Sequence, residues 1–277
     1  MRLPAIGAVV AASCLAIPCS LGAQQLKPET VRDFECYVQT AEQRMAARQA
    51  FLLADSEPAL NDQVVRAHRI ETVPGYGSNP HKVSGGLVFD WIGTVFIPGT
   101  NLEQTLRMLQ DYDHRAQYFS ETIASSKLLC RRGDGQFRYT MRLKEPAVMD
   151  VESAVLWERL DPHRLRCASY SSEVRPVGKD KGYLRMLNSY WRFAENSNGV
   201  YVEGETVTLS DPFSSLMRGL GSLMGINPEK SLRHSLESMR ETLGKSGMQF
   251  PGPATGAAEC GEPYRPGRPA GCAETAR

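Results

Sequence analysis

The stretch VSGGLVFDWIGTVFIPG occupies residues 83–99, and it is followed by TNLEQTLRMLQ at 100–110 and by DYDHRAQYF at 111–119. The first part predicts a strand, because its apolar run contains glycines that allow a strand to bend and it ends at a Pro-Gly pair. Asn101 can cap a short helix with one apolar face. A second helical turn follows, and a new strand begins near Glu121. A strand, two short helices and another strand therefore open the domain.

The chain has 277 residues, so it is long enough to bury a sizeable core. Residues 1–23 combine one basic residue, a short apolar run and a small-residue exit, which predicts a secretory signal peptide cleaved after Ala23. Export then makes the mature chain secreted or periplasmic. The whole chain carries 32 Lys and Arg against 31 Asp and Glu. This balance gives no general attraction to nucleic acid, so we expect no nucleic-acid partner.

Strand patterns dominate the middle of the chain. Short turn sequences separate them, which predicts an antiparallel meander with one face toward a core. We expect the strand at 82–97 to pair with the last of these strands as the sheet curls. The six candidates are Glu121 to Cys130, Gln136 to Leu143, Val148 to Leu160, His163 to Val174, Tyr183 to Phe193, and Val200 to Ser210.

Helical patterns lie at both ends. Residues 28–54 have apolar side chains spaced by threes and fours, and we expect this extra helix to pack on the outside of the fold or at its edge. A Pro at its start and a Gly at its end frame a last helix over 227–243. Beyond it, 12 of the 34 residues of 244–277 are Gly or Pro, a composition that predicts a disordered tail.

Five cysteines follow the predicted signal peptide, at 36, 130, 167, 260 and 272. An exported compartment permits disulfides. A bridge between Cys260 and Cys272 is favoured, because both lie in the same predicted tail. Cys130 and Cys167 lie in strand patterns, where a buried free thiol is the favoured interpretation.

This order of elements over residues 82–243 resembles the helix-grip fold of the START-like superfamily, also called SRPBCC or Bet v 1-like. The strongest local match runs from Val95-Phe-Ile-Pro-Gly to Ser125-Ser-Lys-Leu-Leu. The resemblance implies an α+β fold in which a curved antiparallel sheet of about seven strands surrounds a long C-terminal helix. Two short helices follow the first strand. The domain is then expected at 81–243, preceded by a helix and connector at 24–80.

The resemblance also implies an apolar cavity between the sheet and the last helix. Members of the superfamily bind lipids, sterols, quinones, polyketides or plant hormones, and some are cyclases or hydrolase activators. Motifs of serine hydrolases, zinc proteases, phosphate loops and dinucleotide-binding folds are absent from the sequence, so we expect no cofactor. Asp111 and His114 form a small polar cluster, for which a structural role is favoured over a metal site.

The candidate ligand-binding residues lie on the later strands and in the segment before the last helix. We expect an apolar wall with one or two polar groups that orient the ligand. A buried Arg185 and Glu205 would form an ion pair or bind a polar head group, whereas one residue of register would place both in solvent. The candidates are Tyr139, Met141, Trp157, Tyr170, Arg185, Trp191, Glu205, Met217 and Leu220.

Three functions follow from this pattern. The first is an exported protein that binds a hydrophobic small molecule or lipid, with residues 211–226 as a lid. The second is a cyclase-like or hydrolase-like enzyme that uses a cavity carboxylate, for example Glu205, as general base. The third is an envelope-associated module that makes transient membrane contact through residues 212–226.

Overall fold

The computed structural model of the protein describes residues 26–65, 69–144, 148–178, 183–212, 227–245, 247–262, 264 and 272. The predicted signal peptide at 1–23 therefore lies outside the described residues. The same holds for most of the predicted lid, including Met217 and Leu220.

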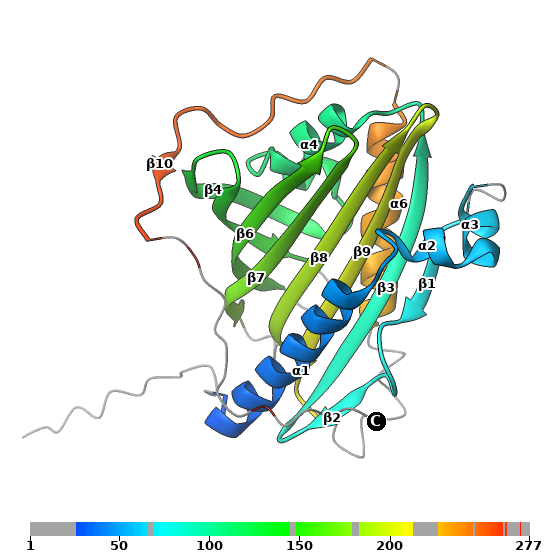
Figure 1. The fold of residues 1–277 in the computed structure, drawn as a ribbon. Coiled ribbons are helices and arrows are strands. Elements are labelled where there is room, and N and C mark those ends of the chain that lie inside the picture. Colours follow the sequence, from blue (N-terminus) through cyan, green and yellow to red (C-terminus); the bar gives the residue numbers. More distant parts are fainter. Residues whose placement is uncertain are drawn as a thin grey trace, which may run out of the picture.

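A single open sheet forms the body of the molecule, in the order β1-β3-β9-β8-β7-β6-β5-β4-β10, with β2 also paired to β3 (Figure 1). All neighbours are antiparallel except β10 and β4. The strands are β1 (Glu71–Pro74), β2 (His81–Val83), β3 (Gly86–Pro98), β4 (Ile123–Arg132), β5 (Gln136–Leu143), β6 (Met149–Asp161), β7 (Arg164–Pro176), β8 (Leu184–Asn196), β9 (Gly199–Ser210) and β10 (Ala258–Glu259).

The predicted α+β class and the curved antiparallel sheet are confirmed, as is the pairing of the first long strand, β3, with β9. The expected number of strands, about seven, is wrong, because the sheet has ten. The extra strands β1, β2 and β10 are short and come from the connector and the tail. They satisfy backbone groups along β3 and β4, which would otherwise be exposed edges.

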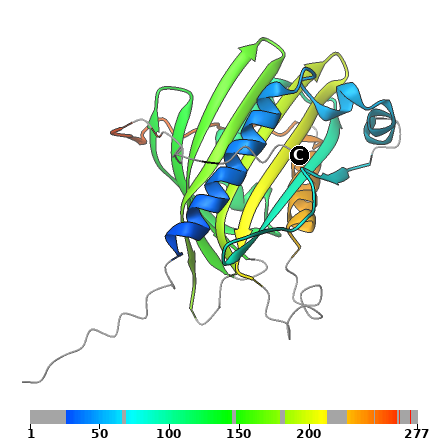
Figure 2. The same ribbon diagram turned by 60° about the horizontal axis from the view of Figure 1, so that its bottom comes forward.

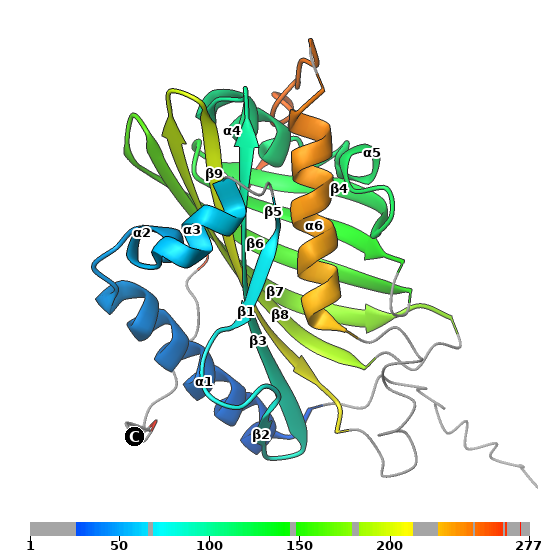
Figure 3. The same cartoon turned by 90° about the vertical axis from the view of Figure 1, so that its right-hand side faces the viewer.

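The helices lie on both faces of the sheet. Helix α1 crosses the outer, convex face, and α6 lies in the concave face with α4 and α5 near one end (Figures 1–3). The last helix, α6, has 16 residues, fewer than the 20 of α1. It is therefore shorter than the long C-terminal helix that was expected. The helices are α1 (Pro28–Ala47), α2 (Leu53–Ser56), α3 (Pro58–Val65), α4 (Leu102–Gln110), α5 (Arg115–Tyr118) and α6 (Pro228–Leu243).

The main core fills the space between the concave face and α6. Leu232 and Leu236 of α6 are buried there, and both lie against Gly93 of β3. A Cβ atom at Gly93 would lie 2.7 Å from a methyl carbon of Leu236, so the glycine permits this close approach. A second, smaller core joins α1 to the convex face and includes Phe34 and Val207.

The tail is not disordered over the part that the structure describes. Ala258 and Glu259 form β10, and Cys260 is bonded to Cys130 of β4. Cys272 is bonded to Cys36 of α1. The expected Cys260–Cys272 bridge is therefore wrong. The tail follows the sheet edge and then returns to α1, which brings each of its cysteines to a different, distant partner.

No helix within the described ranges combines the length and the apolar character needed to cross a membrane.

Candidate functional site

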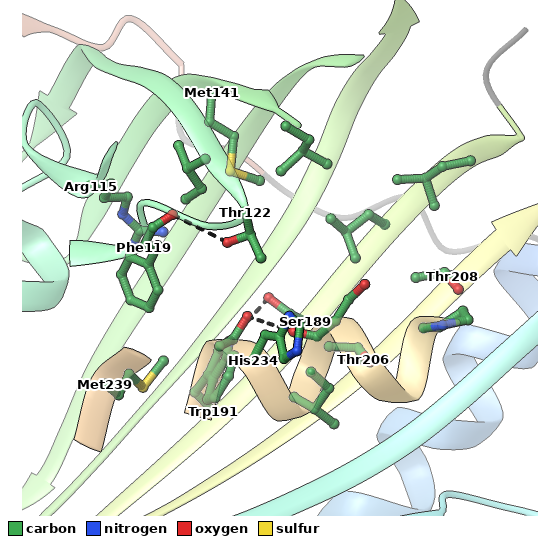
Figure 4. Close-up of a pocket in the computed structure, with 18 of the residues that line it drawn as sticks. Arg115, Phe119, Thr122, Met141, Ser189, Trp191, Thr206, Thr208, His234 and Met239 are labelled. Carbon is green, nitrogen blue, oxygen red and sulfur yellow. Dashed lines mark hydrogen bonds between the residues drawn. The ribbon is translucent and has the colours of Figure 1, made fainter. Parts of the chain in front are cut away.

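A cavity of about 230 Å³ lies between the concave face of the sheet and α6 (Figure 4). One wall is apolar and comes from β4, β5, β6 and β8. Met239 of α6 and Phe119, which follows α5, add to it. This wall includes Ile123, Tyr139, Met141, Leu143, Trp157, Leu187 and Trp191.

The part of the wall next to β8 is polar and comes mainly from β9. Alternation along this strand points Thr206, Thr208 and Ser210 into the cavity, while Glu205 and Val207 face α1. Thr208 is only 6% exposed, and within the described part of the chain neither its hydroxyl nor that of Thr206 has a hydrogen-bond partner. Buried hydroxyls are normally paired, so this wall can accept a polar group from a ligand.

Arg115 of α5 is the charged group at the end of the cavity opposite Thr208 (Figure 4). Its guanidinium carbon lies 4.7 Å from the ring centroid of Tyr112 and 4.7 Å from that of Tyr139. Its Nη2 donates to the carbonyl oxygen of Leu109 at 2.8 Å, and its Nη1 lies 3.5 Å from the Tyr139 hydroxyl. Its buried Nε has no partner.

The strands β7 and β8 separate at one end of the cavity. Their ladder stops at Tyr170 and Asn188, although β7 continues to Pro176. Beyond that point the Ser171 hydroxyl accepts a hydrogen bond from the backbone N–H of Leu187 at 2.8 Å. Leu184 and Leu187 line the cavity at this end, together with Ser210 and the first turn of α6. The described lining of the cavity therefore reaches the ends of β8 and β9.

Four of the predicted site residues line the cavity: Tyr139, Met141, Trp157 and Trp191. The Trp157 Nε1 donates to the Tyr112 hydroxyl at 2.9 Å, which fixes the indole. The Trp191 ring lies over Gly204 of β9, where an added Cβ would come within 2.4 Å of it. Side-chain placement supports these four predictions, while their role in ligand binding stays a prediction.

Three of the predicted residues lie elsewhere. Tyr170 faces α1, and its hydroxyl donates to Glu42 at 2.9 Å. Glu205 also faces α1, because the cavity-facing Trp191 is opposite Gly204 in the ladder and the next residue points the other way. Arg185 binds Asp211 at 2.8 Å, since a register shift between Leu184 and Met186 breaks the alternation of β8. Arg185 and Glu205 therefore do not pair with each other.

Glu205 belongs to a buried charge cluster under α1. Its carboxylate binds Arg44 of α1, which also lies 3.4 Å from Asp90 of β3. Tyr37 donates to Asp90 at 3.0 Å. Burial and the neighbouring Asp90 raise the pKa of Glu205 to about 8, against the opposing effect of Arg44. The pKa of Asp90 is also raised, chiefly by burial.

Glu205 is therefore separated from the cavity by the sheet and has no access to a ligand there. Among the described residues that line the cavity there is no Asp or Glu. The carboxylate that was expected as general base is thus absent from the described lining.

Arg115, Thr206 and Thr208 were not among the predicted site residues. Arg115 lies in the segment 111–119, which was interpreted as architecture. The two threonines alternate with Glu205 and Val207, and this alternation could have identified them once the face of β9 was known.

Asp111, Asp113 and His114 have the structural role that was predicted for this segment. The Asp111 carboxylate binds the His114 Nδ1 at 2.7 Å and the Tyr118 hydroxyl at 2.5 Å. Asp113 accepts a hydrogen bond from the backbone N–H of Leu128 at 2.9 Å. These bonds join α5 to the turn before it and to β4.

A curved antiparallel sheet around a C-terminal helix, with two short helices after its first long strand, defines a START-like helix-grip fold. No protein-family model matches the chain. No curated protein matches it either.

Among solved structures, the chain is similar to the STAR-related lipid transfer protein from Xanthomonas axonopodis, with a TM-score of 0.45, 16% identity, and coverage of 61% of this chain and 98% of that one. It is also similar to a START superfamily protein from Mycobacterium smegmatis, with a TM-score of 0.42, 12% identity, and coverage of 57% and 97%. For human STARD10 the TM-score is 0.38 at 9% identity, with coverage of 70% and 83%. At these TM-scores the similarities carry no inference about ligand or activity.

Proposed function

We propose that this protein binds one hydrophobic small molecule, or one lipid tail, in the cavity between the sheet and α6. The observation that carries the proposal is a cavity that combines an apolar wall with two hydroxyls for which the described residues supply no hydrogen-bond partner. Sites for drug-sized ligands are typically about 300–1,000 Å³ and mostly apolar, with a few polar groups that orient the ligand. The volume of about 230 Å³ favours a small molecule over a lipid with two tails.

Binding is favoured over catalysis by the composition of the lining. Apolar contacts would supply most of the affinity, because burial of apolar surface contributes about 25 cal/mol per Å². The hydroxyls of Thr206 and Thr208 would donate a hydrogen bond to an oxygen of the ligand, or accept one from a hydroxyl of the ligand. Such a bond compensates the cost of leaving these groups unpaired in the empty cavity.

We also propose that the protein is exported and acts outside the cytoplasm. Support comes from the predicted signal peptide and from the two disulfides, Cys36–Cys272 and Cys130–Cys260, since disulfides persist mainly in oxidising compartments. N-terminal sequencing of protein from fractionated cells tests this, with Gln24 expected as the first residue. Full-length chain in the cytoplasm would refute it. Membrane contact through residues 212–226 stays a prediction.

An uncharged probe, 1-decanol, tests the binding proposal in the delipidated protein. Wild type is expected to take up one molecule per chain in a saturable titration. Leu187→Trp places a larger ring in the cavity and should abolish uptake, whereas Leu160→Trp makes the same change at an exposed site on β6 and should not. Equal uptake by both variants would show that the cavity is not the site.

A further inference from the structure

Arg115 is a cation with no counter-charge among the residues that the structure describes. It makes no ion pair with any carboxylate of the described chain, and the described lining of the cavity contains no Asp or Glu. Other arginines on the sheet have such partners, for example Arg138 with Glu152 and Arg142 with Asp150. A half-buried guanidinium without a carboxylate is costly, because desolvation of a charge is compensated mainly by an opposite charge.

The surroundings of Arg115 hold the guanidinium in place and leave part of it available. The rings of Tyr112 and Tyr139 each lie 4.7 Å from its central carbon, and such cation–π contacts offset part of the desolvation. One strong hydrogen bond, to Leu109, uses one of its five donors. The planar guanidinium is therefore oriented before the ligand binds, which favours bidentate binding of a carboxylate.

Two further basic groups line the cavity, Lys230 and His234, and both lie on the first half of α6. Lys230 is exposed, and the His234 Nδ1 lies 4.0 Å from the Glu121 carboxylate. These groups are therefore hydrated or already close to an acid, unlike Arg115. The charges that face the cavity are positive throughout its described lining, which favours an anionic ligand over a neutral or cationic one.

We propose that the ligand is a hydrophobic carboxylate whose carboxylate group binds Arg115 and whose hydrocarbon part lies along the apolar wall, with any further oxygen of the ligand at the hydroxyls of Thr206 and Thr208. This inference rests on the proposed function and adds the chemical class and the orientation of the ligand. A carboxylate at Arg115 supplies the missing counter-charge and accepts hydrogen bonds from the free donors. The apolar side chains of the cavity wall then contact the rest of the ligand.

The test compares decanoate with 1-decanol, two probes of equal chain length that differ in charge. Hydrogen bonds to charged groups contribute enough that wild type should bind decanoate roughly tenfold to a hundredfold more tightly than 1-decanol. Arg115→Met should remove this preference and leave the affinity for 1-decanol unchanged to within roughly threefold. Arg138→Met, at an exposed position of β5, is the matched control and should behave as wild type.

The outcomes separate this inference from the proposed function. Equal affinity of wild type for both probes, or a preference for decanoate that persists in Arg115→Met, would overturn the role of Arg115 while 1-decanol binding still supports the cavity as a site. Failure of wild type to bind either probe would overturn the proposed function itself. If Arg115→Met does not fold by circular dichroism, Arg115→Gln keeps a hydrogen-bond donor without the charge and must lose the same preference.

Discussion

Replacement of Glu205 by Gln should stabilise the protein at alkaline pH. In wild type, two buried carboxyl groups, Asp90 and Glu205, share one guanidinium, that of Arg44. Gln keeps the shape of Glu and removes one negative charge, so Arg44 and Asp90 remain as a matched pair. Its amide can also donate toward the Asp90 Oδ1, for which the described residues supply no hydrogen-bond donor.

The magnitude follows from the pKa of Glu205, which burial and Asp90 raise from 4.5 to about 8. A raised pKa means that the folded protein holds a proton that the unfolded chain releases, so stability is present at low pH and is lost as pH rises through about 8. With about 1.4 kcal/mol per pKa unit, the loss is on the order of 5 kcal/mol. The free energy of unfolding of Glu205→Gln should therefore equal that of wild type near pH 4.5. Near pH 9 it should be higher than that of wild type by an amount of this order.

Urea denaturation at a series of pH values, with the disulfides intact, measures this difference. Glu203→Gln is the matched comparison, because Glu203 lies two residues away on the same face and binds two arginines, Arg48 and Arg192. Loss of its charge leaves both guanidiniums without a counter-charge, so this variant should be less stable by about 3–5 kcal/mol. A Glu205→Gln protein that is less stable than wild type at alkaline pH, or a difference independent of pH, would refute the reasoning.

Three further predictions concern the cavity and the tail. Gly204→Ala adds a Cβ that would lie about 1 Å too close to the Trp191 ring, so the ring should move into the cavity. We expect the free energy of unfolding to fall by about 1–3 kcal/mol. Calorimetry should also show weaker binding of 1-decanol. Thr208→Val removes an unpaired buried hydroxyl and should raise the thermal midpoint of the empty protein, which differential scanning calorimetry can measure. Combined Cys130→Ala and Cys260→Ala should lower the unfolding free energy by about 2–5 kcal/mol in urea titrations, whereas no change would mean that the tail contributes nothing to the fold.

The order of the main elements could be predicted because each has a strong local pattern. Asn101 caps α4 by accepting a hydrogen bond from the Gln104 N–H, as its position in the sequence predicted. Asn227 and Pro228 begin α6 in the same way. The turns between the central strands also agree with the observed hairpins. In these segments the residues that decide the structure are neighbours in the sequence.

The faces of the strands were harder to predict, because a single residue of register reverses them. On β8 the alternation correctly groups Leu187, Ser189 and Trp191 on the cavity face. Arg185 does not follow this alternation, because the register of the ladder shifts between Leu184 and Met186. No residue type in the sequence indicates that shift. Glu205 was a candidate ligand-binding residue whose face was left open, and it faces α1 because the cavity-facing Trp191 is opposite Gly204.

The tail and the disulfides could not be predicted from composition. Seven glycines and five prolines in 244–277 indicate a lack of regular structure, and they do not reveal two long-range covalent bonds. Cys130 and Cys260 meet because β10 lies along the edge of β4. Cysteine spacing alone cannot show such a pairing, since connectivity depends on the folded chain.

The most direct test of the central claim is native mass spectrometry of the full chain purified from cells that export it, followed by organic extraction. The account predicts a complex with one hydrophobic carboxylate per chain. That added mass should be absent from Leu187→Trp, in which the cavity is filled, and present in Leu160→Trp. Wild-type protein that carries no hydrophobic molecule, and takes up none when decanoate or 1-decanol is added, would contradict the account.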